Sequence, residues 1–214
     1  MFITFEGIEG CGKTTQVKRL AIRLERAGIP ILMTREPGGT RIGQEIRKIL
    51  LDARNESLSS LAELFLYAAD RSQHIREMIQ PALKDEKWVL CDRFSDATTV
   101  YQGLSRGLDM DLVANLNDLA ADGLRPDLTF LLDCPVSVGL QRAFSRNKVL
   151  HHENQDRFER EKEKFHRSVR QGYLDLANRE KGRIIVIDAT LGEDEMERAI
   201  FRHISPLMEK AKEK

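Results

Sequence analysis

The residues with the clearest capacity for chemistry form one run near the start of the chain, Gly7-Ile8-Glu9-Gly10-Cys11-Gly12-Lys13-Thr14. It matches the pattern G-x-x-x-x-G-K-[ST], whose glycines let the backbone curl so that several N–H groups point at one anion. The start of the helix that follows would add its positive end. We therefore expect this loop and Thr15 to bind the phosphates of ATP or GTP, with Lys13 at the β- and γ-phosphates and the Thr14 hydroxyl on Mg²⁺.

Other motifs decide whether such a loop serves a GTPase or a nucleotide kinase. A GTPase switch needs DxxG after a strand and NKxD for guanine; no aspartate here is followed by glycine three residues on, and residues 147–150 read NKVL. Arginines instead recur in several later segments. This favours a nucleotide kinase, because phosphoryl transfer requires two anionic substrates to be held in line while their charge is neutralised. A nucleotide-dependent switch or binding module is the alternative.

Short apolar runs and amphipathic segments alternate along the chain and predict the elements that position these residues. Strands are expected at residues 2–5, 29–33, 88–91, 128–132 and 184–187, each apolar nearly throughout, as in a parallel sheet covered on both faces. Helices are expected at residues 14–27, 58–83, 136–145, 157–178 and 194–208. The alternation predicts an α/β fold of the P-loop NTPase type, with a five-stranded parallel sheet flanked by helices on both faces.

We expect one nucleotide-kinase domain, residues 1–214, with a mobile lid at about residues 142–156. The lid assignment depends on residues 145–156, which are polar, basic at their start and without periodicity; a plain surface loop is the alternative. The adjacent His151 and His152 are interpreted as solvated side chains of this segment. Elsewhere, His74 is predicted to lie on a helix surface and Trp88 to pack within a strand.

Composition and charge limit the partners. The chain has 34 basic and 34 acidic residues, with a hydrophobic fraction of 41% and a charged fraction of 32%. Nucleic-acid binders usually carry a basic surface, so no nucleic-acid partner is expected. No membrane partner is expected either, because no run approaches the ~18 apolar residues of a membrane span. Three cysteines without metal-ligand spacing, and a start without a basic leader segment, favour the cytoplasm.

Beyond the phosphate-binding loop, seven blocks resemble thymidylate kinases, in the same order and over roughly residues 1–190. They are Arg35-Glu36-Pro37-Gly38-Gly39-Thr40, Tyr67-Ala68-Ala69-Asp70-Arg71, Asp92-Arg93-Phe94, Tyr101-Gln102-Gly103, Pro126-Asp127-Leu128-Thr129, Leu132-Asp133 and Asp156-Arg157-Phe158-Glu159. The resemblance implies an enzyme that transfers the γ-phosphate of ATP to dTMP, giving dTDP for dTTP biosynthesis, with Mg²⁺ and as a homodimer. A kinase of another nucleoside monophosphate, such as UMP or CMP, is the alternative within this class.

The resemblance also assigns residues that act on the phosphates. Arg93 would bind the acceptor phosphate, a task that suits its planar fork, and Asp92 would lie near Mg²⁺. Some family members carry a catalytic arginine inside the phosphate-binding loop; this chain does not, and so resembles the bacterial form with lid arginines. Arg142 and Arg146 would then stabilise the charge of the transition state.

For the nucleoside, the resemblance implies that Tyr67 stacks on thymine, where most relatives have Phe. Arg71, four positions later, would hydrogen-bond the base. Tyr101 would close off the 2′ position of the sugar, and Glu9 would accept a hydrogen bond from the 3′-hydroxyl. The remaining contacts to dTMP are assigned to Glu36, Pro37, Thr98 and Gln102.

Overall fold

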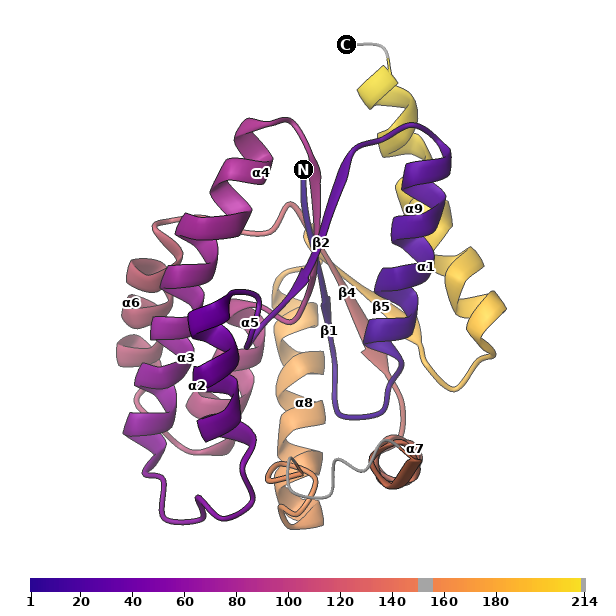
Figure 1. The fold of residues 1–214 in the computed structure, drawn as a ribbon. Coiled ribbons are helices and arrows are strands. Elements are labelled where there is room, and N and C mark those ends of the chain that lie inside the picture. Colours follow the sequence, from indigo (N-terminus) through magenta and orange to yellow (C-terminus); the bar gives the residue numbers. More distant parts are fainter. Residues whose placement is uncertain (150–155, 213–214) are drawn as a thin grey trace.

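The computed structural model describes residues 1–149 and 156–212, which contain a five-stranded sheet. Its strands are β1 (Phe2–Glu6), β2 (Ile31–Arg35), β3 (Trp88–Asp92), β4 (Leu128–Asp133) and β5 (Ile184–Asp188). All neighbouring strands are parallel, in the order β2-β3-β1-β4-β5 (Figure 1). The parallel five-stranded sheet expected from the apolar runs is confirmed.

The strands end on charged residues that the apolar pattern leaves out. Arg35 pairs with Asp92 across β2 and β3, and Asp133 pairs with Asp188 across β4 and β5. Strands β1, β3, β4 and β5 therefore extend beyond their expected ends, and β2 is displaced towards the carboxyl end of the expected run. Ligands of open parallel sheets bind outside the carboxyl ends of the strands, so these charged side chains gather at the edge where a site is expected.

Helices cover both faces of the sheet (Figure 1). On one face lie α1 (Lys13–Arg26) and α9 (Glu193–Lys212). On the other lie α3 (Ser60–His74), α6 (Met110–Ala121) and α8 (Glu163–Arg179), with α2 (Arg41–Leu51) packed against α3. The same side holds α4 (Gln80–Lys84), α5 (Ser95–Thr98) and the π-helical turns η1 (Ile75–Ile79) and η2 (Thr99–Ser105), while α7 (Val136–Val149) follows β4. Helices α2 and α6 are not predicted by the sequence analysis.

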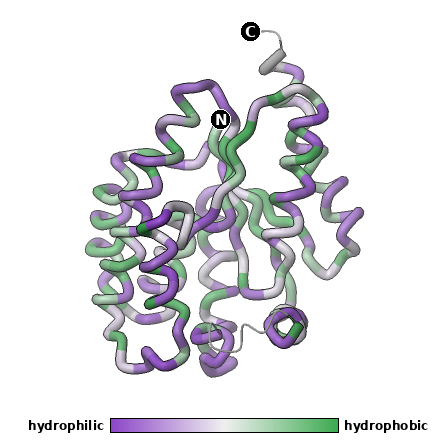
Figure 2. Tube along the Cα trace, viewed as in Figure 1, coloured by the Kyte–Doolittle hydropathy of each residue, from purple (hydrophilic) through white to green (hydrophobic). Residues whose placement is uncertain are grey.

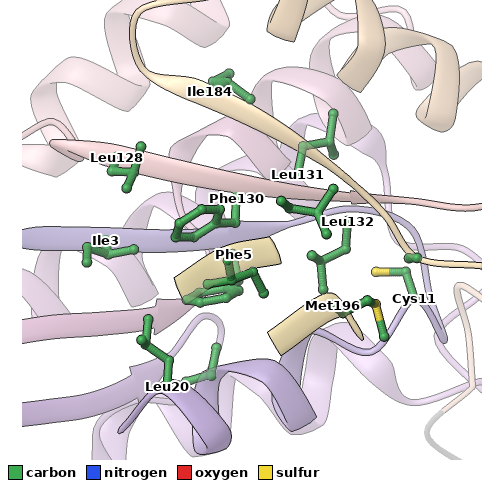
Figure 3. Packing of buried hydrophobic residues seen from close by; sticks show 14 of the residues in the cluster. Ile3, Phe5, Cys11, Leu20, Leu128, Phe130, Leu131, Leu132, Ile184 and Met196 are labelled. Atoms are coloured by element: carbon green, nitrogen blue, oxygen red, sulfur yellow. The ribbon is translucent and has the colours of Figure 1, made fainter. Parts of the chain in front are cut away.

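Apolar residues of the strands and of the inward helix faces form the core. Ile3, Phe5 and Phe130 belong to one cluster with Leu20 of α1 and Met196 of α9 (Figure 3). Figure 2 shows green, hydrophobic strands, whereas purple, hydrophilic residues occur along the outer helices. Burying a large apolar side chain stabilises the folded state by about 1.5–3 kcal/mol. The sheet is therefore stable, and it holds the residues at its carboxyl edge in place. No helix within the described ranges is long and apolar enough to cross a bilayer.

Part of the expected irregular segment is helical. Helix α7 continues to Val149, so residues 145–149 belong to it. Residues 157–160 form turns and α8 begins only at Glu163, so the helix expected from residue 157 starts later than predicted. His151 and His152, with the rest of residues 150–155 of the proposed lid, lie outside the described residues.

The prediction that His74 lies on a helix surface is wrong. Its side chain is fully buried. The Nδ1 atom lies 3.0 Å from Glu36 Oε1, and Nε2 lies 2.7 Å from the hydroxyl of Thr34. Both partners come from β2 and the residue after it, and the periodicity of α3 carries no information about them. Trp88 packs in the core, as predicted.

Candidate active site

A cavity of about 920 Å³ opens at the carboxyl edge of the sheet. It is lined by the loop after β1, the ends of β2 and β3, and helices that include α3 and α7. The residues expected to bind ligand that line it are Glu9, Gly10, Gly12, Lys13, Thr14, Thr15, Glu36, Pro37, Tyr67, Arg71, Asp92, Arg93, Thr98, Tyr101, Gln102, Arg142 and Arg146. Gly7, Ile8 and Cys11 are not among its lining residues; Ile8 and Cys11 are buried in the core and support the loop from behind.

The phosphate-binding loop depends on glycine at positions where the chain curls and touches its neighbours. Gly7, Gly10 and Gly12 have φ of 135°, 70° and 96°, a region that other residues rarely adopt. A Cβ at Gly7 would lie 2.4 Å from the carbonyl oxygen of Leu132, and one at Gly10 would lie 2.0 Å from that of Gly139. The loop is therefore packed closely between the end of β4 and the first turn of α7.

Lys13 is the first residue of α1 and folds back over the loop. Its Nζ donates hydrogen bonds to the carbonyl oxygens of Gly7 at 3.0 Å and Ile8 at 2.7 Å. These contacts satisfy the ammonium group, which also lines the cavity. A phosphate bound in the cradle would offer stronger, charged acceptors to the same group.

Thr14 and Asp92, the two residues expected from the sequence to lie at a metal ion, have their side-chain oxygens in contact. The Thr14 hydroxyl donates to Asp92 Oδ2 at 2.5 Å, although the residues come from α1 and the end of β3. Mg²⁺ prefers oxygen and is usually held by one or two carboxylates together with substrate phosphates and water. The donor set fits Mg²⁺ beside a nucleotide bound in the loop.

Arg93 follows β3 in the left-handed region, with φ of 72°. Its Nη1 donates to the hydroxyl of Tyr173 and its Nη2 to Glu9 Oε1, both at 3.1 Å. The guanidinium also lies over the ring of Tyr101, 5.1 Å from the centroid. A guanidinium has five N–H groups, so Arg93 is fixed at the cavity wall with donors left for an anion.

Two residues that support Arg93 were missed by the sequence analysis. Tyr173 of α8 donates to Glu6 Oε2 at 2.7 Å, and Glu6 Oε1 accepts from the N–H of Phe94 at 2.7 Å. Burial raises the pKa of Glu6 to about 7; Asp96 raises it further, whereas Arg93, Tyr173 and the Phe94 N–H lower it. The sequence does contain a signal for Glu6: it is an acidic residue at the end of an apolar strand, directly before the phosphate-binding loop.

Arg71 is almost completely buried and connects four segments. Its Nε donates to Glu36 Oε2 at 2.9 Å, its Nη1 to Asn117 of α6 at 2.7 Å, and its Nη2 to the Thr98 hydroxyl at 2.9 Å. Glu36 precedes Pro37 through a cis peptide bond. Asn117 is a further site-supporting residue that the sequence analysis did not predict. Three N–H groups of Arg71 are thus used within the protein, which fixes the guanidinium plane at the cavity wall.

The aromatic and amide side chains of the expected nucleoside site also lie together. Tyr67 of α3 is half-buried and lines the cavity, so it is accessible to a ligand. The Tyr101 hydroxyl donates to Glu9 Oε1 at 2.6 Å. Gln102 donates to buried Glu63 at 2.7 Å, which holds its amide in place.

The two arginines of α7 face the same cavity from the side of the phosphate-binding loop. Arg142 Nη1 donates to the carbonyl oxygen of Ala189, after β5, at 2.8 Å. Arg146 Nη2 donates to Glu159 at 3.2 Å, and its Nε donates to Asn147 at 3.1 Å. Both guanidinium groups are therefore positioned by the protein near the loop.

A glycine-rich anion-binding loop at the start of α1 and a ring of arginines share one cavity at the carboxyl edge of a parallel sheet. This arrangement defines a P-loop nucleotide-binding protein, and the arginines facing the loop are typical of the kinases among them. The thymidylate kinase family model matches residues 5–200, and the chain belongs to the thymidylate kinase family.

Similar proteins cover nearly the whole chain. The thymidylate kinase of Geotalea daltonii is 56% identical over 200 residues, which are 93% of this chain and 94% of the relative. The thymidylate kinase of Geobacter sulfurreducens is 57% identical over 191 residues, which are 89% of this chain and 90% of the relative. The crystal structure of thymidylate kinase from Ehrlichia chaffeensis aligns with a TM-score of 0.75 at 33% identity, covering 95% of this chain and 98% of that one.

Proposed function

We propose that this protein phosphorylates dTMP to dTDP with ATP and Mg²⁺, a step of dTTP biosynthesis. The observation that carries the proposal is the single cavity that joins the phosphate-binding loop to Arg93, Tyr101 and Glu9. Two phosphorylated molecules can meet in it end to end, which is the arrangement that phosphoryl transfer needs.

At the donor end, the backbone of the loop and the Lys13 ammonium bind the phosphates of ATP. Thr14 and Asp92 are the residues that hold Mg²⁺, which when bound neutralises charge on the transferred phosphate. Lys13 exchanges its bonds with the carbonyl oxygens of Gly7 and Ile8 for bonds with phosphate oxygens.

At the acceptor end, Arg93 binds the phosphate of dTMP, which is itself the nucleophile, so no general base is required. Arg142 and Arg146 approach the same point from α7 and stabilise the negative charge of the transition state. The segment of about residues 142–156, which includes both arginines, acts in this proposal as a lid that excludes water and limits ATP hydrolysis.

The nucleoside is recognised by the walls between these two ends. Tyr67 stacks on thymine, and the two N–H groups of Arg71 that have no partner among the described residues are directed to the base. Tyr101 occupies the space beside the sugar, and its bond with Glu9 directs the carboxylate towards the 3′-hydroxyl. Glu36, Pro37, Thr98 and Gln102 complete the wall.

An assay of ADP release tests the proposal when dTMP, dUMP, UMP and CMP are supplied in turn with ATP and Mg²⁺. We expect dTMP to have the highest kcat/KM, and Lys13→Ala to abolish most of the activity while circular dichroism shows a folded protein. A preference for UMP or CMP would assign the chain to another monophosphate kinase. ATP binding without ADP release for any acceptor would make it a binding module.

We also propose that the protein is a homodimer in the cytoplasm. Helices α2, α3 and α6 lie side by side (Figure 1) and expose the large apolar side chains Ile42, Ile49, Leu61, Phe65, Leu112 and Leu119. Exposed large apolar side chains on neighbouring helices are typical of an interface, and a second copy would bring the same helices. Cys11, Cys91 and Cys134 are buried and unpaired, which suits a reducing compartment.

Sedimentation tests the dimer. Phe65→Asp should shift the protein to the monomer, whereas Val186→Asp, which places a charge at a similarly exposed apolar position on β5, should leave the oligomeric state unchanged. A wild-type monomer at micromolar concentration would contradict the proposal.

A further inference from the structure

His166 is a buried side chain that the reaction described above does not use. It lies in the first turns of α8, and its relative exposure is 0%. Among the residues that the structure describes, neither of its ring nitrogens has a hydrogen-bond partner. Leaving a buried polar group unsatisfied is unfavourable, so such a group is expected to serve a contact that tightens in the working protein.

The atom that His166 faces is the unpartnered oxygen of Glu9. Its Nδ1 lies 3.5 Å from Glu9 Oε2, which is also buried and has no hydrogen bond to any described residue. The other oxygen, Oε1, already accepts from Arg93 and Tyr101. A movement of a few tenths of an ångström would convert the long contact into a hydrogen bond.

The charges determine the direction of this bond. Burial by itself would raise the pKa of Glu9, but His166, Arg93, Lys13 and Tyr101 together hold it well below its usual range. Glu9 is therefore a carboxylate, which can only accept hydrogen bonds, and the ring nitrogen that faces it must carry the hydrogen.

We propose that His166 is a positioning residue for Glu9: it holds the second carboxylate oxygen, so that Glu9 presents a fixed acceptor to the 3′-hydroxyl of the bound nucleotide. The inference depends on the proposed function. Arg93, Tyr101 and His166 hold the carboxylate from the loop after β3, from η2 and from α8. Without His166, Arg93 and Tyr101 hold the carboxylate through Oε1 alone, so Oε2 is less firmly placed and selection for a 3′-hydroxyl weakens.

The test compares dTMP with 3′-deoxythymidine 5′-monophosphate, which lacks only the hydroxyl. His166→Leu and His166→Asn have nearly the same shape, but only Asn keeps an N–H donor near the position of Nδ1. We expect the ratio of kcat/KM for the two substrates to fall about fivefold or more in His166→Leu and to stay within about twofold of wild type in His166→Asn. KM for ATP should be unchanged in both variants.

Val169→Ala is the matched control, because it removes buried volume one turn further along α8 without touching Glu9. It should lower the thermal midpoint and leave the substrate ratio as in wild type. If His166→Leu does not fold, His166→Gln takes its place, since its amide lies near the position of Nε2 instead. The ratio of kcat/KM for dTMP to that for the 3′-deoxy substrate should then fall in His166→Gln and stay near the wild-type value in His166→Asn.

A ratio that is unchanged in His166→Leu, or equally low in the Asn and Leu variants, would overturn the proposal. A fall in kcat/KM of the same size for both substrates would also overturn it, because a purely structural role of His166 predicts that result. A wild-type enzyme that makes dTDP but does not distinguish the two substrates also overturns it. By contrast, a wild-type protein with no activity on dTMP would contradict the proposed function itself.

Discussion

Gly10 and Gly139 touch backbone to backbone, although they belong to the phosphate-binding loop and to α7. A Cβ on Gly139 would lie 2.6 Å from the carbonyl oxygen of Glu9 and 2.8 Å from the Cδ1 of Ile8. Because α7 also carries Arg142 and Arg146, this contact fixes where the two arginines lie relative to the phosphate-binding loop.

Gly139→Ala should therefore separate the loop from α7. We expect kcat to fall about tenfold to a hundredfold, because small displacements of reacting groups are costly, and stability to fall by about 1–3 kcal/mol, as for other overpacked sites. Steady-state kinetics and urea unfolding measure the two effects. Gly182→Ala is the control, since no described residue beyond its two chain neighbours has a heavy atom within 4 Å of the added methyl group. Equal kinetics for the two variants would show that the contact does not position the arginines.

Arg93→Ala should remove most of the activity and leave the fold intact. Loss of a preorganised donor to a reacting group typically costs about 10²–10³ in kcat. Tyr173→Phe keeps Arg93 but deletes the hydroxyl that accepts from it, and should cost less. The assignment of the acceptor phosphate to Arg93 is refuted by an Arg93→Ala enzyme with normal kcat and KM for dTMP.

Tyr101→Ala should relax the rejection of a 2′-hydroxyl. In the proposed complex the ring would fill the space next to the sugar, whereas the hydroxyl donates to Glu9. The relative kcat/KM for ribothymidine 5′-monophosphate against dTMP should rise about tenfold in Tyr101→Ala, an effect of one lost steric contact of ~1.4 kcal/mol, and much less in Tyr101→Phe. Unchanged discrimination in the Ala variant would rule out the steric role.

Glu6 should make stability depend on pH. Its folded pKa of about 7 is raised from an ordinary 4.5, so above pH 4.5 the unfolded chain releases a proton that the folded protein keeps. Stability relative to Glu6→Gln should fall as pH rises from about 4.5 to about 7 and level off above it. Urea unfolding of both proteins across this range measures the difference. A difference that grows in favour of wild type with rising pH would contradict the assignment.

The local patterns of the chain were sufficient for the sheet and for the centre of the site. The glycine spacing before Lys13 and Thr14 specifies an anion-binding turn because its chemistry resides in consecutive residues. The five short apolar runs likewise specify the five strands, because each strand is encoded by consecutive residues. The strand ends at Asp92 and Asp188 were missed, because a charged residue at the functional edge does not look like part of a buried strand.

The supporting residues could not be found in this way. The sequence predicts His74 on a helix surface, whereas its partners in the structure are Thr34 of β2 and Glu36, the residue after that strand. Similarly, Tyr173 and Glu6 are 167 positions apart and meet only because α8 packs on the sheet, against β4 and β5.

The sequence by itself determined the class of the protein, the phosphate-binding loop and most of the residues at the cavity wall, because these signals are short-range. Only the tertiary structure decided which side chains stand behind them, including the approach of His166 to Glu9 and the contact of Gly10 with Gly139. Burial and hydrogen bonding between distant segments depend on how the helices pack on the sheet. The periodicity of apolar residues along the chain does not indicate which residues of distant segments will be in contact.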